Sequence, residues 1–342
     1  MVTNRDVAQK AGVSLATVSH VVNNTRPVSA LTRQKVERAI KALDYHPSAL
    51  ARSLSTHSTR TIGLMVGSIT LPLTAHLYRA LEPAFSARGY SLVLRNIGED
   101  PTREAACLEE FLGRRVDGIL LFPSGKPLPQ HAACEAAGIP MVFLNRRPRG
   151  IPGPLIELDS SRACEEATEY LVGLGHRRIA LLNREYHFAP FTSRERGYRR
   201  AMRRHATPPQ VTYVPGRIDE SEPAAEIAAR QLLAGALRPT AIIAASHGIS
   251  IGLLQAIRAA GLTCPHDLSV ICFDDSSWSM CVDPPLTVMK HPTAAVSNAI
   301  VETLLAEIAP KPAARKSIIQ RFHGTFVERA SCGPPPILSR EP

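Results

Sequence analysis

From residue 60 to residue 308, short runs rich in β-branched and apolar residues alternate with segments of amphipathic helical pattern. Such alternation is typical of parallel sheets with helices on both faces. The predicted strands are 60–67, 90–96, 118–122, 141–144, 155–158, 179–183, 211–214, 241–245 and 269–273. About 280 residues exceed one lobe of this kind, so the sequence predicts a doubly wound α/β core of two lobes with a cleft between them.

The first 46 residues show a different pattern, typical of three short helices. Thr3 and Asp6 have the spacing of a capping box, Gly12 permits a tight turn, and Ser14 can cap a second helix. We expect helices over 5–11, 15–23 and 32–43. Two short helices joined by a glycine-containing turn form a helix-turn-helix, which the third helix closes into a small all-α domain.

Positive charge is concentrated at this end of the chain. Residues 1–60 contain nine Lys and Arg against three Asp and Glu, whereas the rest of the chain is close to balanced. A compact cationic module is expected of a domain that meets phosphate groups. On charge alone, a merely solvated basic face is the alternative.

Proline and polar residues indicate the boundaries between the parts of the chain. Pro47 prevents the third helix from continuing, and the segment 48–55 can form barely two helical turns, which are marginal in water without a partner. The predicted division is a helix-turn-helix domain at 1–47, a hinge helix and linker at 48–59, a two-lobed core at 60–330 and a Pro-rich tail at 331–342.

Several functional classes find no support in the sequence. There is no apolar run of transmembrane length and no secretory signal, so a cytoplasmic protein is expected. The seven cysteines form no CxxC pair, and motifs for a P-loop, a GxSxG nucleophile or an HExxH metal site are absent, so neither an enzyme nor a metal or cofactor is expected. A free-standing ligand-binding protein would share the two-lobed core but would need an export signal and no basic module.

A series of different short motifs, in a fixed order, extends along almost the whole chain. They include Asp6-Val7-Ala8, Ala11-Gly12-Val13-Ser14, Thr17-Val18-Ser19-His20-Val21-Val22-Asn23, Tyr45-His46-Pro47, Arg115-Val116-Asp117-Gly118, Gly175-His176-Arg177-Arg178, Arg194-Glu195-Arg196-Gly197-Tyr198, Phe273-Asp274-Asp275 and Pro285-Leu286-Thr287. With these motifs the chain resembles the lactose/galactose repressor family of bacterial transcription regulators. The resemblance implies a DNA reader, a hinge helix and a core built like periplasmic sugar-binding proteins, acting as an effector-controlled homodimer on a palindromic operator.

The resemblance also implies which residues meet DNA. Leu15, Ala16 and His20 match base-reading positions, where an apolar side chain suits a thymine methyl group and an imidazole can bond to a base edge. Phosphate contacts or helix capping are implied for Ser14, Thr17, Ser19 and Asn23, and Arg26 is a further expected DNA contact. Leu54 matches a leucine that wedges into the minor groove; packing on the core is the alternative for this residue.

Candidate effector contacts follow from two arguments. In open α/β sheets ligands bind beyond the carboxyl ends of the strands, which nominates segments that contain Thr70 and Arg146. The resemblance implies contacts from Asn145, Phe188, Arg194, Ser246, His247 and Asp274, with Trp278 as an aromatic wall. For each of these, solvation or a structural hydrogen bond is the alternative.

The class of effector is less constrained than the position of its site. Where many members of the family carry carboxylates, this chain has Asn145-Arg146-Arg147 and Ser246-His247. Arginine suits carboxylate and phosphate groups, so we expect a sugar acid or another anionic metabolite, with a neutral sugar as the alternative. Inducer and corepressor, activator and repressor, and dimer and tetramer stay open at this point, although a short tail without heptads favours the dimer.

Overall fold

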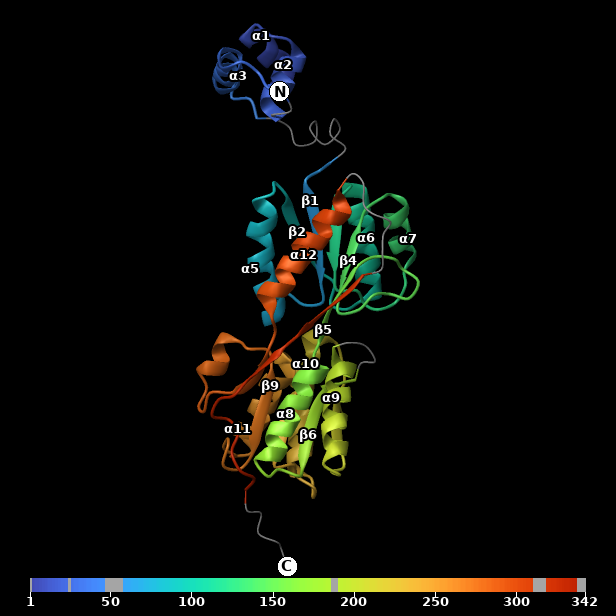
Figure 1. The fold of residues 1–342 in the computed structure, drawn as a ribbon, viewed down its shortest axis with the longest axis vertical. Coiled ribbons are helices and arrows are strands. Elements are labelled where there is room, and N and C mark those ends of the chain that lie inside the picture. The colour runs from blue at the N-terminus through green and yellow to red at the C-terminus, as the bar shows by residue number, and fades with distance from the viewer. Residues whose placement is uncertain (1, 24–25, 47–57, 186–189, 310–317, 337–342) are drawn as a thin grey trace, which may run out of the picture. The chain divides into compact units, whose positions relative to one another are not determined.

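The computed structural model describes residues 2–23, 26–46, 58–185, 190–309 and 318–336 (Figure 1). By its internal contacts the chain divides into two compact units, Met1–Thr61 with Arg115–Asp117, and Ile62–Arg114 with Gly118–Pro342. The predicted hinge helix at 48–55 lies outside the described residues. Within the described ranges, no helix is long and apolar enough to cross a membrane.

The first unit contains the three predicted N-terminal helices. They are α1 (Asn4–Ala11), α2 (Leu15–Asn23) and α3 (Ala30–Ala42). The capping box is present, since the Thr3 amide donates to Asp6 Oδ2 at 2.7 Å, and Gly12 ends α1 with φ of 64°, a conformation that favours glycine. The small core consists of Val7, Ala8, Val18, Val21, Val36 and Ala39, with Tyr45 at its edge. The predicted helix-turn-helix and its third helix are therefore confirmed.

The second unit begins with a lobe built on a parallel sheet, here called the amino lobe. Its strand order is β11-β5-β4-β3-β1-β2. The strands are β1 (Thr61–Val66), β2 (Ser91–Asn96), β3 (Gly118–Leu121), β4 (Met141–Leu144), β5 (Leu155–Asp159) and β11 (Ile319–His323). The helices are α5 (Pro72–Ser86), α6 (Pro101–Arg114), α7 (Pro129–Ala136) and α12 (Thr293–Ile308). The central strands are buried on both faces, which explains their nearly continuous apolar sequence.

The carboxyl lobe repeats this design. Its strand order is β12-β10-β9-β8-β6-β7. The strands are β6 (Ile179–Arg184), β7 (Gln210–Val214), β8 (Ala241–Ala244), β9 (Ser269–Phe273), β10 (Thr287–Lys290) and β12 (Thr325–Val327). The helices are α8 (Ser161–Gly173), α9 (Phe191–Arg204), α10 (Ser221–Ala234) and α11 (His247–Ala259).

The chain passes between the two lobes three times: between β5 and α8, between β10 and α12, and between β11 and β12 (Figure 1). The two-lobed α/β core expected from the sequence is therefore confirmed. The sequence did not predict α7, β10, β11 or β12. Moreover, β12 pairs antiparallel with β10, so the second sheet is not purely parallel.

His176 lies in the connection between α8 and β6. Its side chain links this connection to Gly333, near the C-terminal end of the described residues. Its side chain is fully buried. The Nδ1 atom lies 2.8 Å from Thr240 Oγ1, and Nε2 lies 2.9 Å from the Gly333 carbonyl oxygen and 3.0 Å from Ser269 Oγ. These contacts give His176, which precedes two arginines in the sequence, a structural role in the carboxyl lobe.

The stability of the carboxyl lobe should depend on pH through His176. Burial lowers the pKa of this imidazole below its ordinary 6.5, although the bond to Gly333 opposes the shift. The unfolded chain consequently binds more protons as the pH falls through 6.5, and the free energy of unfolding should decrease there. Urea unfolding at several pH values should show this loss in the wild type and a smaller one in His176→Gln. Equal pH dependence in both proteins would contradict the assignment.

Candidate nucleic-acid interface and ligand cavity

One side of α2 presents small and polar side chains together with an unusual leucine. Ser14, Leu15 and Ala16 are exposed at its N-terminal end, and Leu15 retains 50% of its surface. Thr17, Ser19 and His20 are half-buried, whereas Val18 between them is fully buried in the domain core. A helix that places exposed residues of this kind at its start is suited to contacting base edges in a major groove.

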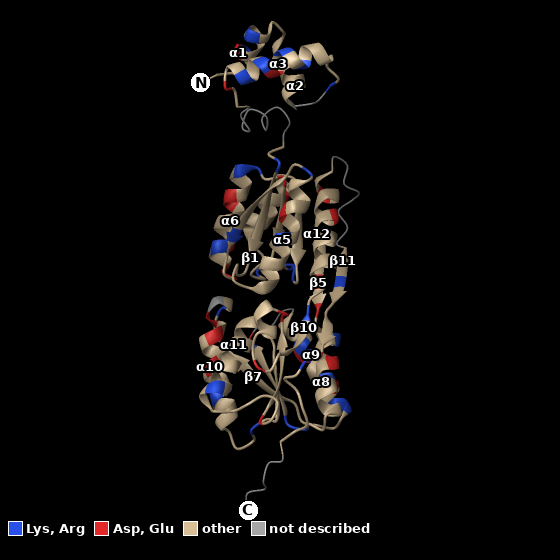
Figure 2. Ribbon diagram, turned by 90° about the vertical axis from the view of Figure 1, so that its left-hand side faces the viewer, with Lys and Arg blue, Asp and Glu red and all other residues tan. Residues whose placement is uncertain are grey.

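Ser14 has a structural role as well as a candidate role in binding. Its Oγ accepts a hydrogen bond from the Thr17 amide at 3.1 Å and lies 2.9 Å from Thr17 Oγ1, so it caps α2. Arg26 is exposed after the helix. Figure 2 shows further Lys and Arg residues on α1 and α3. Asn23 ends α2, but its side chain and all of Leu54 lie outside what the structure describes.

A cavity opens between the two lobes of the second unit, at the carboxyl ends of their strands. Its polar lining consists of Thr74, Glu99, Asn145, Arg146, Arg194, Ser246, Asp274 and His291. Its apolar lining includes Leu71, Leu73, Phe122, Leu144, Phe191 and Ile218. We call this space the inner chamber. A mainly apolar cavity with a few convergent polar groups is the usual form of a small-molecule site.

Arg194 is the central cation of the inner chamber. It is 3% exposed, its guanidinium lies 4.1 Å from the centre of the Phe273 ring and 5.3 Å from that of Phe191, and Nη1 donates to the Ala245 carbonyl. Burial lowers its pKa to about 10, against the opposing charge of Asp274. Within the described chain, its Nε has no hydrogen-bond partner. A buried donor without a partner costs free energy unless a ligand supplies the acceptor.

Asp274 follows β9 and supplies the matching negative charge. Burial would raise the pKa of its carboxyl, but the hydrogen bond and charge of His291, with the charges of Arg194 and His247, lower it to about 2. The His291 Nε2 atom lies 2.8 Å from Asp274 Oδ1. The chamber therefore holds a permanently ionised acceptor next to a buried cationic donor.

Asn145 completes the polar lining from the amino lobe, directly after β4. Its Oδ1 accepts the Leu158 amide at 3.1 Å, which leaves the NH₂ group as the part of the side chain available to a ligand. Asn145, Glu99 and Asp274 all have positive φ, at 63°, 58° and 74°. Non-glycine residues adopt this backbone at a cost of about 1 kcal/mol or more, and such strain is concentrated at functional sites.

Two ion pairs connect the lobes beside the inner chamber. Arg184, at the end of β6, is 1% exposed and its Nη2 lies 2.9 Å from Glu99 Oε2. Arg217 Nη1 lies 3.1 Å from Asp100 Oδ2. Glu99 is also 3.6 Å from Arg146 Nη2, while Arg146 Nε donates to the Pro123 carbonyl. Arg146 therefore lies in the chamber as expected, but its charge is already engaged by Glu99.

The predicted effector residues do not all meet in one place. Asn145, Arg146, Arg194, Ser246 and Asp274 line the inner chamber, and Ser246 also caps α11. Thr70 is exposed and lies 2.8 Å from Ser68 Oγ through its hydroxyl. Phe188 lies outside the described residues.

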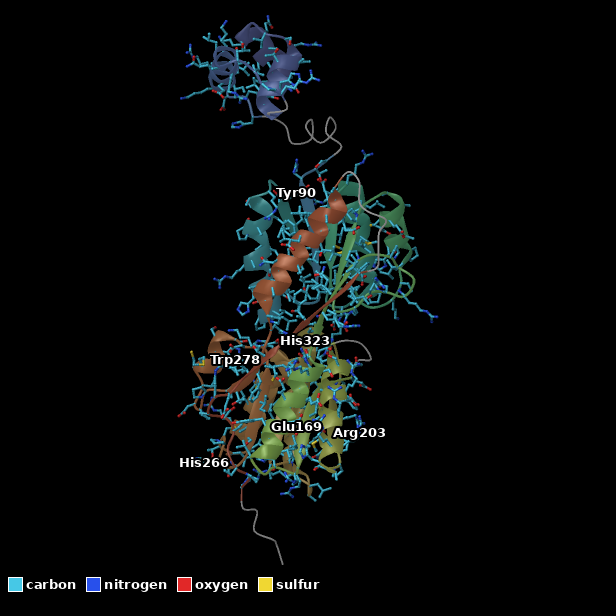
Figure 3. All side chains as sticks on the ribbon, in the orientation of Figure 1. Tyr90, Glu169, Arg203, His266, Trp278 and His323 are labelled. Carbon is cyan, nitrogen blue, oxygen red and sulfur yellow. The ribbon has the colours of Figure 1, made fainter. Side chains whose placement is uncertain are left out.

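Trp278 has a different position from the predicted aromatic wall. Figure 3 shows Trp278 on the carboxyl lobe. There it lines a second depression together with Leu254, Cys264 and Val282. Its ring is 5.7 Å from that of His247. The aromatic walls of the inner chamber are instead Phe122 and Phe191, and the sequence also missed Glu99, Ile218 and His291 as lining residues.

Comparisons with known proteins agree with this arrangement of two units. Residues 3–48 match the family model described as bacterial regulatory proteins, lacI family, and residues 168–332 match that of a periplasmic binding protein-like domain. The ribose operon repressor of Escherichia coli (strain K12) is 37% identical over 310 residues, which cover 90% of this chain and 93% of the relative. The HTH-type transcriptional repressor PurR of Vibrio atlanticus (strain LGP32) is 33% identical over 338 residues, covering 97% and 98%.

Solved structures give the same result. The crystal structure of the lac repressor dimer bound to operator and the anti-inducer ONPF superposes with a TM-score of 0.83 at 29% identity, covering 97% of this chain and 99% of that one. A complex of the transcriptional regulator CelR with cellobiose has a TM-score of 0.70 at 27% identity, covering 97% and 100%. The likeness therefore extends over the DNA-reading unit and both lobes.

Proposed function

The chain belongs to the lacI family of bacterial transcriptional repressors, and we propose that it binds a palindromic operator as a homodimer under the control of a small metabolite held between its lobes. The relatives are repressors and not enzymes. The observation that carries the proposal is the presence of two opposite charges, buried Arg194 and partly buried Asp274, in the lining of a cavity at the carboxyl ends of both sheets. Such a repressor works where bacterial DNA lies, in the cytoplasm.

The exposed start of α2 supports the assignment of the DNA contacts. Leu15 and Ala16 offer apolar surface to thymine methyl groups, and His20 offers a hydrogen bond to a base edge. We assign phosphate contacts to Ser14, Thr17, Ser19, Asn23 and Arg26, and a minor-groove wedge to Leu54. Selecting genomic fragments with the full-length protein at near-physiological salt tests this, since affinity depends steeply on salt. An enriched palindrome supports a dimeric reader. If folded protein enriches no sequence, either alone or with candidate ligands added, the proposal is contradicted.

Two exposed leucines provide a matched test of the DNA-reading surface. Leu15 begins α2 and is 50% exposed, whereas Leu31, near the start of α3, is 73% exposed. We expect Leu15→Ala to weaken binding to the selected operator by about tenfold, because an apolar base contact is worth roughly 1–2 kcal/mol. Leu31→Ala should leave affinity nearly unchanged. Fluorescence anisotropy on operator and random DNA checks both, and equal losses in the two variants would contradict the assignment of α2.

The second depression on the carboxyl lobe supports dimerisation there. Its lining is largely apolar, with Ile251, Leu254, Trp278, Val282 and Pro284, and Met280 nearby is 55% exposed. Apolar side chains gathered at one place on the surface are suited to an interaction site. The related lac repressor structure is that of a dimer, and a two-fold operator requires two readers. We therefore propose a second copy of this chain as the occupant.

Closure of the two lobes is the proposed route from effector to DNA. The pairs Arg184–Glu99 and Arg217–Asp100 connect the lobes next to the inner chamber, so a ligand there alters the balance between open and closed states. The Asp117 carboxylate holds the chain as it leaves the first unit, accepting the Thr59 amide at 2.8 Å. Effector and operator affinities are then reciprocally coupled. Operator titration with and without ligand distinguishes an inducer from a corepressor.

The inner chamber favours a hydroxyl-rich part of the effector. Its formal charges are nearly balanced, since Arg146 faces Glu99 and Arg194 faces Asp274. The anionic expectation rested on Arg146 and Arg147, but Arg147 Nη1 also donates to a carbonyl, that of Gly153, at 2.6 Å. Donors on Asn145 and Arg194 and the acceptor Asp274 suit hydroxyl groups. We propose that a sugar-like portion binds here.

A further inference from the structure

The inner chamber borders a second space that the mechanism above does not use. This outer chamber is lined by His76 and Arg79 of α5, by Lys290 at the end of β10, and by Asp275. Leu73, Asp274 and His291 line both chambers. The two spaces are therefore adjacent, and Leu73, Asp274 and His291 form the wall that they share.

The sizes of the two chambers differ strongly. The inner chamber has a volume of about 80 Å³ and the outer one about 460 Å³. A water-sized group needs roughly 10–15 Å³ of such space, so the inner chamber takes about five to eight non-hydrogen atoms. A sugar ring fills it completely. A larger substituent, such as a phosphoryl or carboxylate group, therefore finds room in the adjacent outer chamber.

The outer chamber carries surplus positive charge. The Asp274 carboxylate lies 2.8 Å from His291 Nε2 and faces the charge of Arg194. Asp275 is balanced by Arg329, whose Nη2 lies 2.8 Å from Oδ1, whereas Lys290 is 3.9 Å from its Oδ2.

Two further basic side chains add to this charge. In the described part of the chain, the structure records no ion pair for His76 or Arg79, and both are exposed to solvent. Lys290 and Arg79 are thus the basic groups that an incoming anion meets.

We propose that the effector is a hydroxyl-rich metabolite with a terminal anionic group, whose sugar-like part occupies the inner chamber and whose anion binds Arg79 and Lys290 in the outer one. Arginine binds phosphate or carboxylate through two parallel hydrogen bonds, and lysine adds a mobile charge. This inference rests on the proposed effector site. The effector is thus again expected to be anionic, but its anion is bound by Arg79 and Lys290 and not by Arg146 and Arg147.

Matched pairs of compounds test the inference on the full-length protein. Ribose and ribose 5-phosphate, glucose and glucose 6-phosphate, and glucose and gluconate are compared by isothermal titration, with inorganic phosphate as a further probe. We expect at least one anionic member to bind tenfold or more tightly than its neutral partner. The phosphate and carboxylate pairs show which anion the outer chamber prefers.

Charge variants connect that preference to the chamber. Arg79→Gln and Lys290→Gln should each reduce the preference for the anionic member by about tenfold while leaving the affinity for the neutral member unchanged. Arg88→Gln is the matched control, since Arg88 is exposed just beyond α5, where its Nη1 donates to the Ala84 carbonyl at 2.8 Å. A preference that survives both chamber variants overturns the inference.

The same titrations separate this inference from the proposed function. Neutral sugars that bind as tightly as every anionic partner, with binding lost in Asp274→Asn, would overturn the outer subsite and leave the effector site intact. Absence of binding by every member of the panel would overturn both.

Discussion

Gly197→Ala is expected to lower the free energy of unfolding by about 3 kcal/mol or more, the largest stability effect of the substitutions considered for this chain. Gly197 lies in α9 where this helix crosses α8. A Cβ atom at this position would stand 2.0 Å from the Ser161 carbonyl oxygen and 3.1 Å from the Glu165 nitrogen. These are backbone atoms of α8, so the added methyl group cannot be accommodated by a side-chain rotation. The two helices have to move apart.

Gly173→Ala is the control for this substitution. Gly173 ends α8 and is exposed, and no atom lies within 4 Å of a Cβ built there. Replacing a helical glycine by alanine usually stabilises by about 0.5–1 kcal/mol. Urea unfolding of both variants checks the pair. A Gly197→Ala protein as stable as Gly173→Ala would show that α9 is free to shift on α8.

The displacement should also reach the effector site. Gly197 lies one turn after Arg194 on the same helix, so a shift of α9 moves the buried guanidinium relative to Phe273 and Asp274. We expect folded Gly197→Ala protein to bind the effector more weakly than the wild type. The motif from Arg194 to Tyr198 thus combines two functions. Arg194 supplies a charge for the ligand, and Gly197 permits a contact between helices that a side chain would prevent.

The parts of the fold that the sequence predicted are those whose pattern is local. The strands β3, β4 and β8 are short apolar runs because both of their faces are covered, and such runs are visible without a structure. In contrast, β11 and β12 are edge strands whose burial alternates or is partial. They exist because β5 and β10 offer them partners, and pairing of that kind is not encoded in their own residues.

The effector site shows the same division between local and long-range information. Asn145 and Asp274 follow predicted strands directly, so the rule that ligands bind at strand ends found them. His291 follows β10, a strand that was not predicted, and Glu99 comes three residues after the end of β2. Applying the rule to the three residues that follow each strand would have included Glu99.

Charge partners are harder still to predict. Glu99 and Arg184 are 85 residues apart in the chain, yet their pairing crosses the two lobes. The sequence shows Arg146 as a cation but gives no sign of the carboxylate that engages it. The sequence therefore could not show that the charge of Arg146 is engaged within the protein, and the family resemblance that implied Trp278 as an aromatic wall could not show that this ring lines another depression.

Asp274→Asn is expected to abolish effector control, with a loss of affinity of about a hundredfold. The wild-type carboxyl has a pKa of about 2, so it is ionised wherever the protein is folded and active, and effector affinity should not follow its titration between about pH 5 and pH 8. Asparagine keeps the size of the side chain but removes the charge that faces Arg194 and His291. Isothermal titration measures the loss, using the compound that binds best to the wild type.

The same substitution should also destabilise the carboxyl lobe. Asp274 Oδ1 lies 2.8 Å from His291 Nε2 and faces the charge of Arg194, so removing its charge leaves these groups less compensated and costs about 3 kcal/mol. Because Arg194 is only 3% exposed, water cannot compensate its charge in place of Asp274. Asp267→Asn is the control, because that carboxylate lies on the same lobe but only caps a turn, accepting the Thr263 amide at 2.8 Å. Operator binding that still responds to the effector in Asp274→Asn, at the concentrations that act on the wild type, would remove Asp274 from the binding site. Loss of the response in Asp274→Asn but not in Asp267→Asn would establish the charge of Asp274 as the group on which effector binding depends.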